Sequence, residues 1–497
     1  MKVVVIGAGL GGLGAALRLQ GAGHEVTVVE QRERPGGRAY QLRDQGYTWD
    51  TGPSLLTMPW VLEETFAAGG LDLGAELTLR RLDPYYRIFW ADDERHLDFV
   101  TDRSQMRAEI AKFSTRDAAA FDGFMAAMKP IYEEGILGAG RREFSSPLDL
   151  ARFTPRMVSL GAATPLYRSV SKHFEHPRIR EAFSFQSLFI GGDPFRVPAI
   201  YGALVYLQFL DEVWYTDGGL YAIVEALART LDIRCGEAVE HVEQSAGRVT
   251  GVRLAGGAVI AADVVVSNAD VLTAAALLGR REPLRRLKPT MSCFLLYLGT
   301  DRTFPKLLHH TLLVGSGYKD FIADVTRRGV LPSTYSTYIH VPSRSEPSMA
   351  ACDGDSIYVL LPVPNLRADV DWTREADGLR DRLVADFETT FGLTGLDASI
   401  RVEHRMTPED FRDELGAVDG NAFAVEPTLH QSASFRQPNR DRRVTGMYHV
   451  GGGTHPGAGI PGVLLGAEIT AALIADDIVE GRLGTGREAG SRATSHG

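Results

Sequence analysis

Apolar runs and glycine-rich turns alternate through the first thirty residues in the order strand, helix, strand. Residues 2–6 (KVVVI) form a short apolar run typical of a buried parallel strand. Residues 13–19 have helical character, and residues 25–29 form a second apolar run that ends at Glu30. The pattern predicts a βαβ unit at the start of the chain.

Later apolar runs predict two further groups of elements. One group comprises strands at 238–242, 248–254 and 263–270 and a strand at 447–450 that leads into a helix from 463. The other comprises a strand pair within 77–99 that turns at 91–94, strands at 292–298 and 357–363, and a helix over 373–391. A chain of 497 residues exceeds what one core usually accommodates, so we expect more than one domain.

We therefore predict an α/β protein whose Rossmann-like nucleotide-binding domain is built from residues 1–75, 216–289 and 426–480. Residues 76–215 and 290–425 should form an inserted α+β substrate domain, and residues 481–497 a disordered tail.

Residues 197–210 carry no charge, and residues 183–190 are similarly apolar and aromatic. Fourteen residues are too few to span a bilayer, and no apolar run reaches eighteen, so no transmembrane helix is predicted. The stretch indicates either a buried core helix or the wall of an apolar tunnel that opens at a membrane surface. Because the first strand begins at residue 2, we expect no signal peptide and a cytoplasmic protein.

The composition of the chain excludes some classes of binding partner. The formal charge of −10 argues against a nucleic-acid partner and against simple electrostatic adsorption to anionic lipid. The basic cluster at 280–288 is read as a solvated helix face, with a lipid headgroup contact as the alternative. The three cysteines have neither metal nor redox spacing, so no metal site is predicted.

The turn after the first strand has the G-x-G-x-x-G spacing of a dinucleotide-binding loop. Gly7 allows the tight turn, Gly9 lets a pyrophosphate approach the backbone, and Gly12 lets helix and strand pack closely. Glu30 lies eighteen residues after Gly12, where a carboxylate can bind a ribose hydroxyl. The ordered set of strand, glycines, helix, strand and acid predicts dinucleotide binding.

Two more glycine segments favour FAD over NAD as the cofactor. Residues 34–38 read R-P-G-G-R, which resembles the second signature of amine oxidase-like flavoproteins, and residues 451–462 read GGGTHPGAGIPG before a predicted helix. A bare backbone that leads into a helix N-terminus can approach a flat ligand and offer it N–H groups and a positive dipole.

The opening segment, the sequence WDTGPS at 49–54 and the C-terminal GTHPGAGIPGV together resemble the bacterial-type phytoene desaturases, FAD-dependent carotenoid desaturases. The resemblance covers both ends of the chain and its length, whereas the inserted domain matches loosely. His449 stands where that family usually has an aliphatic residue.

The resemblance implies a set of roles. Gly36, Gly37 and Arg38 should lie along the FAD phosphates, and Val239 should meet the adenine through its backbone. The flavin end should be formed by Gly52, Pro53, Gly452, Gly459 and Ile460. His455 is the only titratable side chain in the C-terminal glycine segment, so it is our candidate for a catalytic proton-handling group, with a purely structural role as the alternative.

The activity implied is the desaturation of a hydrophobic polyene, phytoene, to more conjugated carotenes such as lycopene by a protein peripherally bound to the membrane, docked near residues 183–210. Three alternatives stay open: a desaturase of a related or modified carotenoid, another amine oxidase-like flavin oxidase, and a non-enzymatic prenyl-binding relative. The sequence predicts no oligomeric state.

Overall fold

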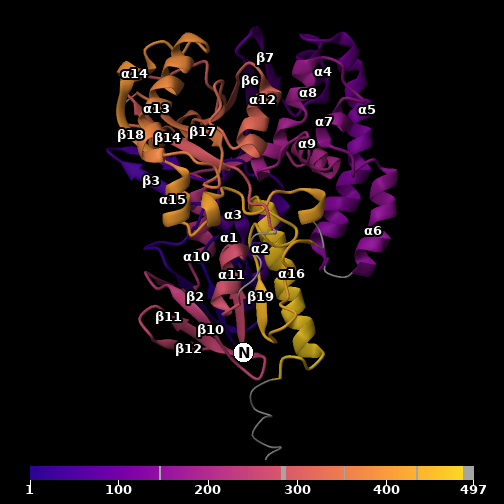
Figure 1. The fold of residues 1–497 in the computed structure, drawn as a ribbon, viewed down its shortest axis with the longest axis vertical. Coiled ribbons are helices and arrows are strands. Elements are labelled where there is room, and N and C mark those ends of the chain that lie inside the picture. The colour runs from indigo at the N-terminus through magenta and orange to yellow at the C-terminus, as the bar shows by residue number, and fades with distance from the viewer. Residues whose placement is uncertain (145–146, 281–286, 352, 433–434, 485–497) are drawn as a thin grey trace, which may run out of the picture.

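The lower half of the molecule is built on a parallel sheet of five strands with the order β19-β13-β1-β2-β9 (Figure 1). The computed structural model describes residues 1–144, 147–280, 287–351, 353–432 and 435–484. The sheet contains β1 (Lys2–Ile6), β2 (Glu25–Glu30), β9 (Asp232–Cys235), β13 (Val264–Ser267) and β19 (Met447–His449), all paired in parallel. Strands from the beginning, middle and end of the chain thus form one sheet, and the predicted βαβ unit and Rossmann-like arrangement are confirmed.

Two helices cross this sheet side by side: α1 (Leu10–Gly21) and α16 (Ile460–Val479), from opposite ends of the sequence. They approach closely because α1 carries Gly14, where a Cβ would lie 2.7 Å from Leu464 Cδ2. Around them lie the elements α2 (Pro59–Ala68), α3 (Leu73–Glu76), α10 (Tyr221–Ala228) and α11 (Val271–Leu277), and a small sheet of β10 (Val239–Ser245), β11 (Arg248–Leu254) and β12 (Val259–Ala261).

The upper half is built on a sheet of seven strands with the order β18-β14-β17-β16-β15-β6-β7. Its members are β6 (Tyr86–Trp90), β7 (Asp93–Phe99), β14 (Ser292–Thr300), β15 (His310–Val314), β16 (Ser336–His340), β17 (Ser356–Val363) and β18 (Ile400–Met406). All of these strands fall within 76–215 or 290–425, whereas the parallel sheet draws only on the other segments. The domain boundaries themselves stay a prediction.

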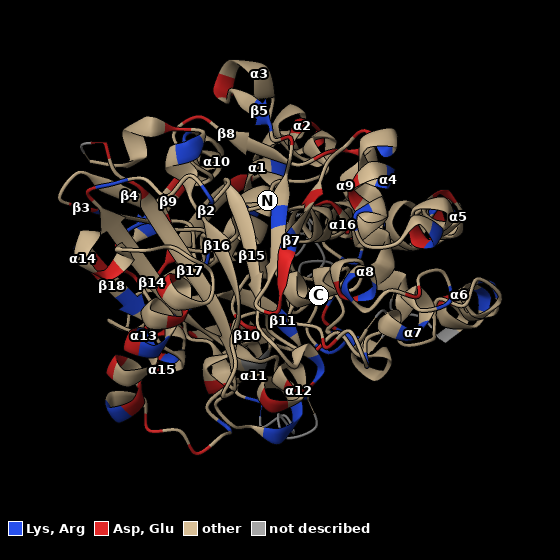
Figure 2. Cartoon of the chain, turned by 90° about the horizontal axis from the view of Figure 1, so that it is seen from above, with Lys and Arg blue, Asp and Glu red and all other residues tan. Residues whose placement is uncertain are grey.

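Helices cover this upper sheet on two sides (Figures 1 and 2). On one side lie α4 (Arg103–Ala111), α5 (Thr115–Tyr132), α6 (Pro147–Ser159), α7 (Leu166–Val170), α8 (Pro177–Ala182) and α9 (Ala203–Leu210). Elsewhere lie α12 (Tyr318–Ala323), α13 (Trp372–Thr389), α14 (Leu396–Ser399) and α15 (Pro408–Asp413). Figure 2 shows acidic and basic residues interspersed along the helices, strands and loops of the chain.

The strand pair expected within 77–99 is confirmed as β6 and β7, and its turn at residues 91–92 is tighter than the expected turn at 91–94. The strand β5 (Leu79–Arg81), also within this range, pairs with β8 (Trp214–Thr216). β3 (Gln41–Asp44) and β4 (Tyr47–Asp50) form a hairpin that the apolar pattern did not reveal. The helix expected over 373–391 is confirmed as α13.

The apolar stretch 183–210 lies inside the molecule. It forms 3-10 turns at Phe185–Ile190 and Ala199–Gly202 followed by α9, and most of its side chains are buried, with Leu210 as an exposed exception. This burial leaves few of its apolar side chains available for docking on a membrane, which stays a prediction. Among the described residues, no helix combines the length and apolar character needed to cross a membrane.

The basic cluster 280–288 is only partly within the structure, because Arg281, Arg285 and Arg286 fall outside the described residues, as does the tail beyond 484. The two described members are engaged in ion pairs. Arg280 pairs with Asp441 at 2.7 Å and Lys288 with Glu426 at 3.1 Å.

Candidate active site

A cavity of about 950 Å³ lies where the two halves meet. Every residue predicted to bind the cofactor lines it, apart from Gly12, and so does His455. Segments from the beginning, middle and end of the sequence therefore converge on one space, although binding itself stays a prediction for each residue.

The glycines after β1 are required by the packing of the turn. Gly7 has a φ of +91°, and a Cβ on Gly12 would lie 2.1 Å from the carbonyl oxygen of Gly7. A Cβ on Gly9 would lie 2.8 Å from Asn268 Nδ2. The turn thus places the N-terminus of α1 at the cavity, and its glycines leave the backbone there without side chains. This is the geometry that binds phosphate.

Glu30 is nearly buried at the end of β2, and its two carboxylate oxygens hold the surrounding backbone. Oε2 accepts from the N–H of Ala8 at 2.7 Å and Oε1 from the N–H of Arg32 at 2.9 Å. Each oxygen keeps a lone pair for a ribose hydroxyl.

Glu237 and Val239, which are neighbours in the sequence, also line the cavity. The carboxylate oxygen Oε2 of Glu237 is buried without a hydrogen-bond partner. An orphaned acceptor at this end fits a ligand that donates hydrogen bonds, as a ribose or an adenine does. Sequence reasoning missed Glu237, because no motif marks it.

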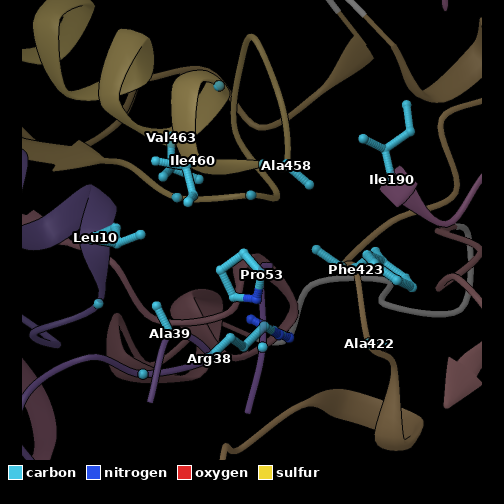
Figure 3. A pocket seen from close by; sticks show the side chains of 18 of the residues that line it. Leu10, Arg38, Ala39, Pro53, Ile190, Ala422, Phe423, Ala458, Ile460 and Val463 are labelled. Atoms are coloured by element: carbon cyan, nitrogen blue, oxygen red, sulfur yellow. The ribbon is translucent and has the colours of Figure 1, made fainter. Parts of the chain in front are cut away.

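Arg38 follows two glycines with positive φ, Gly36 at +130° and Gly37 at +59°. Its guanidinium lies 3.6 Å from Asp270 Oδ2, and its Nε is buried without a hydrogen-bond partner. An anion with several acceptor oxygens fits beside this nitrogen. Figure 3 shows Arg38 beside Pro53 within the cavity.

The C-terminal glycine segment brings a second helix N-terminus to the cavity. Gly459 caps α16 with a φ of +97°, and a Cβ at this position would meet nothing within 4 Å. In Figure 3, Ile460 lies at the start of α16, across the cavity from Pro53. A backbone cradle with open space in front of it fits a flat ring system, and the helix dipole favours electron-rich groups there.

His455 is anchored to the upper half of the molecule. Its Nε2 bonds to the carbonyl oxygen of Ala139 at 2.8 Å, so Nε2 carries the proton and Nδ1 is a buried lone pair without a partner. Burial is the main cause that lowers the pKa of His455 to about 4, so the ring is uncharged at neutral pH. Nδ1 can accept a hydrogen bond, but it is a weak base.

Beyond the flavin end, the cavity runs between the upper sheet and the apolar stretch 185–208. The sheet contributes Leu295, Tyr297, Leu312, Tyr338, Tyr358 and Leu360, and the facing wall contributes Phe185, Leu188, Phe189, Ile200, Leu204 and Leu207. Among the described lining residues of the two walls, the one charged side chain is Arg405 on the edge strand β18, where it pairs with Asp377. Several residues of the stretch thus line this cavity, whereas others are buried in the core. An opening of the cavity at a membrane surface stays a prediction.

Comparison with known proteins agrees with this architecture. The family model for flavin containing amine oxidoreductase matches residues 10–475. The chain is 39% identical over 491 residues to the lycopene-forming phytoene desaturase of Pseudescherichia vulneris, covering 96% of this chain and 99% of that protein. It is 38% identical to the neurosporene-forming phytoene desaturase of Rhodobacter capsulatus, over 96% of this chain and 94% of the relative.

Among solved structures, an oxidoreductase from Methanosarcina mazei superposes with a TM-score of 0.62 at 18% identity, over 96% of this chain and 100% of that one. This likeness shows the shared fold. The chain is therefore an FAD-dependent oxidoreductase that belongs to the flavin-containing amine oxidoreductase family and, within it, to the bacterial-type phytoene desaturases.

Proposed function

We propose that this protein uses FAD to desaturate an apolar carotenoid precursor, converting phytoene to more conjugated carotenes. The observation that carries the proposal is the apolar part of the cavity, which extends from the glycine cradle between Leu295 and Leu360 on one side and Leu188 and Leu204 on the other. A hydrocarbon has no polar handle, so shape and apolar contact must select it. The printed activities of the relatives point the same way.

When bound, FAD supplies the two-electron acceptor of the reaction. The residues of the chain hold and orient the two partners. The N-termini of α1 and α16 and the carboxylate of Glu30 position the cofactor, and Pro53 and Ile460 close the flavin end. The apolar walls exclude water and align the polyene with the cradle.

An oxidase of amines or porphyrinogens is the alternative within the same fold. Such substrates are charged or polar and need matching charges along the cavity. Here charged lining residues such as Glu30, Arg38 and Glu237 lie at the predicted nucleotide end. The described part of the two long walls has one charged side chain, Arg405, which is already paired with Asp377. Conversion of phytoene by the purified yellow protein, with no turnover of amines, tests the choice between the two.

We also propose that the protein binds the membrane surface reversibly through apolar side chains beside the cavity. Ile136 and Phe153 line the cavity, whereas Leu137 and Val158, which belong to the same two elements, are exposed. These elements are the turn Glu133–Gly138 and α6, joined by an ion pair between Glu134 and Arg156. A lipid surface fits this patch, because a substrate dissolved in lipid can then enter without crossing water.

Liposome flotation checks the docking surface. We expect the parent protein to float with vesicles even in ~1 M salt, because screening does not weaken an apolar contact. The double variant Leu137→Asp/Val158→Asp should lose binding by about 10²–10⁴-fold, since each of the two buried side chains contributes about 1.5–3 kcal/mol. Val259→Asp, at an exposed valine on β12 in the lower half, is the matched control. Release of the parent protein by salt would contradict the apolar patch.

A further inference from the structure

A row of buried polar side chains leads from the cavity into the upper sheet. Ser54, next to Pro53 at the flavin end, and Tyr338 on β16 both line the cavity. Ser54 Oγ lies 2.6 Å from the hydroxyl of Tyr338, and that hydroxyl lies 2.7 Å from Nδ1 of His310. These contacts give the cavity wall a polar spot where its surroundings are apolar.

The row continues through three histidines toward the surface. His310 on β15 and His340 on β16 are cross-strand partners with ring centroids 5.1 Å apart. His340 Nε2 lies 3.0 Å from His309 Nε2, and His309 Nδ1 lies 2.7 Å from Ser345 Oγ. The three rings are buried, whereas Ser345 is partly exposed. We call Ser54, Tyr338, His310, His340, His309 and Ser345 the histidine row.

Only one link of the row lacks a direct hydrogen bond, the step from His310 to His340. His310 Nε2 and His340 Nδ1 are the nitrogens concerned, and both are buried without a partner. Leaving two such groups unsatisfied is costly, so a native structure that keeps them calls for an explanation. A water molecule that bridges the two nitrogens would satisfy both and complete the row.

The three imidazole rings are neutral, so the hydrogen bonds along the row can all point the same way. Burial lowers the pKa of His309 to about 3 and holds those of His310 and His340 well below the usual range. A neutral imidazole has one N–H and one lone pair. If Tyr338 donates to His310 Nδ1, then His310 Nε2, His340 Nε2 and His309 Nδ1 each carry a proton that points onward to Ser345.

We propose that the histidine row carries the proton released by desaturation from the cavity to the surface, a role that rests on the proposed function. One carbon of the substrate loses hydride, with two electrons, to the bound flavin. The C–H bond of the neighbouring carbon then breaks, its electron pair forms the new double bond, and its hydrogen leaves as a proton. Tyr338 takes this proton on its oxygen as its own proton passes to His310. One proton enters the row and one leaves at Ser345, so no net charge is buried.

His455 is less suited to this role. Its Nε2 is committed to the carbonyl of Ala139, and its Nδ1 has no further partner. A proton accepted at Nδ1 would have no onward acceptor among the described residues. The geometry favours the structural alternative for His455, as an anchor of the glycine segment.

The test compares Tyr338→Phe and His310→Leu with Tyr85→Phe, which removes a buried hydroxyl without a partner in the upper half, outside the row and outside the cavity lining. All three variants should be yellow with the flavin content of the parent. The two row variants should desaturate phytoene in vesicles about 10²–10⁴-fold more slowly, the range for loss of general acid–base catalysis. Turnover of the parent and of Tyr85→Phe in H₂O/D₂O mixtures should follow a curved dependence on deuterium content, as expected for several protons moving together. Tyr338→Phe should follow a linear one.

The outcomes separate the two proposals. If Tyr338→Phe and His310→Leu convert phytoene at the rate of Tyr85→Phe, the relay is wrong and the proposed function stands. If the yellow parent protein leaves phytoene unchanged, the proposed function fails and the relay with it. The three histidines also lie close enough to hold a metal ion. One equivalent of bound zinc in the parent, lost in His310→Leu, would overturn the relay in favour of a metal centre.

Discussion

Replacing Gly459 by valine is expected to give a folded protein that purifies without its yellow cofactor. Gly459 has a φ of +97°, a conformation that β-branched residues rarely adopt and that costs about 1–3 kcal/mol. The added side chain would also point into open space in front of the α16 N-terminus, where the flavin ring is expected. Strain and collision together should abolish FAD binding, measured as absorbance near the flavin bands after purification with excess FAD.

The matched control is Gly70→Val. Gly70 also has a positive φ, +76°, and a Cβ there would likewise meet nothing within 4 Å, but it lies outside the cavity. This variant should suffer the same backbone strain and keep its FAD. If Gly459→Val stays yellow and active, the C-terminal glycine segment does not contact the flavin.

Replacing Leu204 by aspartate should abolish desaturation while leaving the flavin in place. Leu204 lies on α9 and lines the apolar wall of the cavity, away from the glycine cradle. A carboxylate there must lose its hydration when a hydrocarbon enters, and the substrate offers it no partner. The effective penalty of several kcal/mol corresponds to a loss of kcat/KM on the order of 10³-fold.

Leu210→Asp is the control on the same helix, because Leu210 is exposed and does not line the cavity. It should retain both flavin and activity. Turnover of phytoene by Leu204→Asp at the parent rate would place the substrate elsewhere and remove the main support for the proposed function.

Local sequence patterns located the glycine turn and Glu30, which line one end of the cavity, because the constraints there are local. The spacing of Gly7, Gly9 and Gly12 follows from one tight turn, and Glu30 ends the next strand. Helix and strand periods likewise located the elements of the parallel sheet. The burial of 183–210 was harder to predict, because an apolar stretch has the same sequence pattern whether it faces a core, a cavity or a lipid.

What the sequence could not predict depends on contacts between distant segments. Glu237 carries no motif and becomes notable only because its orphaned oxygen lines the nucleotide end. His310 and His340 are thirty residues apart and meet through the register of β15 and β16. A search for the residue spacings of metal or catalytic motifs therefore does not find the histidine row.

The most direct test of the central claim is a single turnover without oxygen. Purified yellow protein is mixed anaerobically with phytoene in vesicles, and the flavin absorbance and the polyene spectrum are recorded together. We predict that the flavin bleaches as phytoene gains conjugated double bonds, one for each flavin reduced, and that Leu204→Asp does neither. Flavin that stays oxidised with phytoene but bleaches with an amine would contradict the assignment as a carotenoid desaturase.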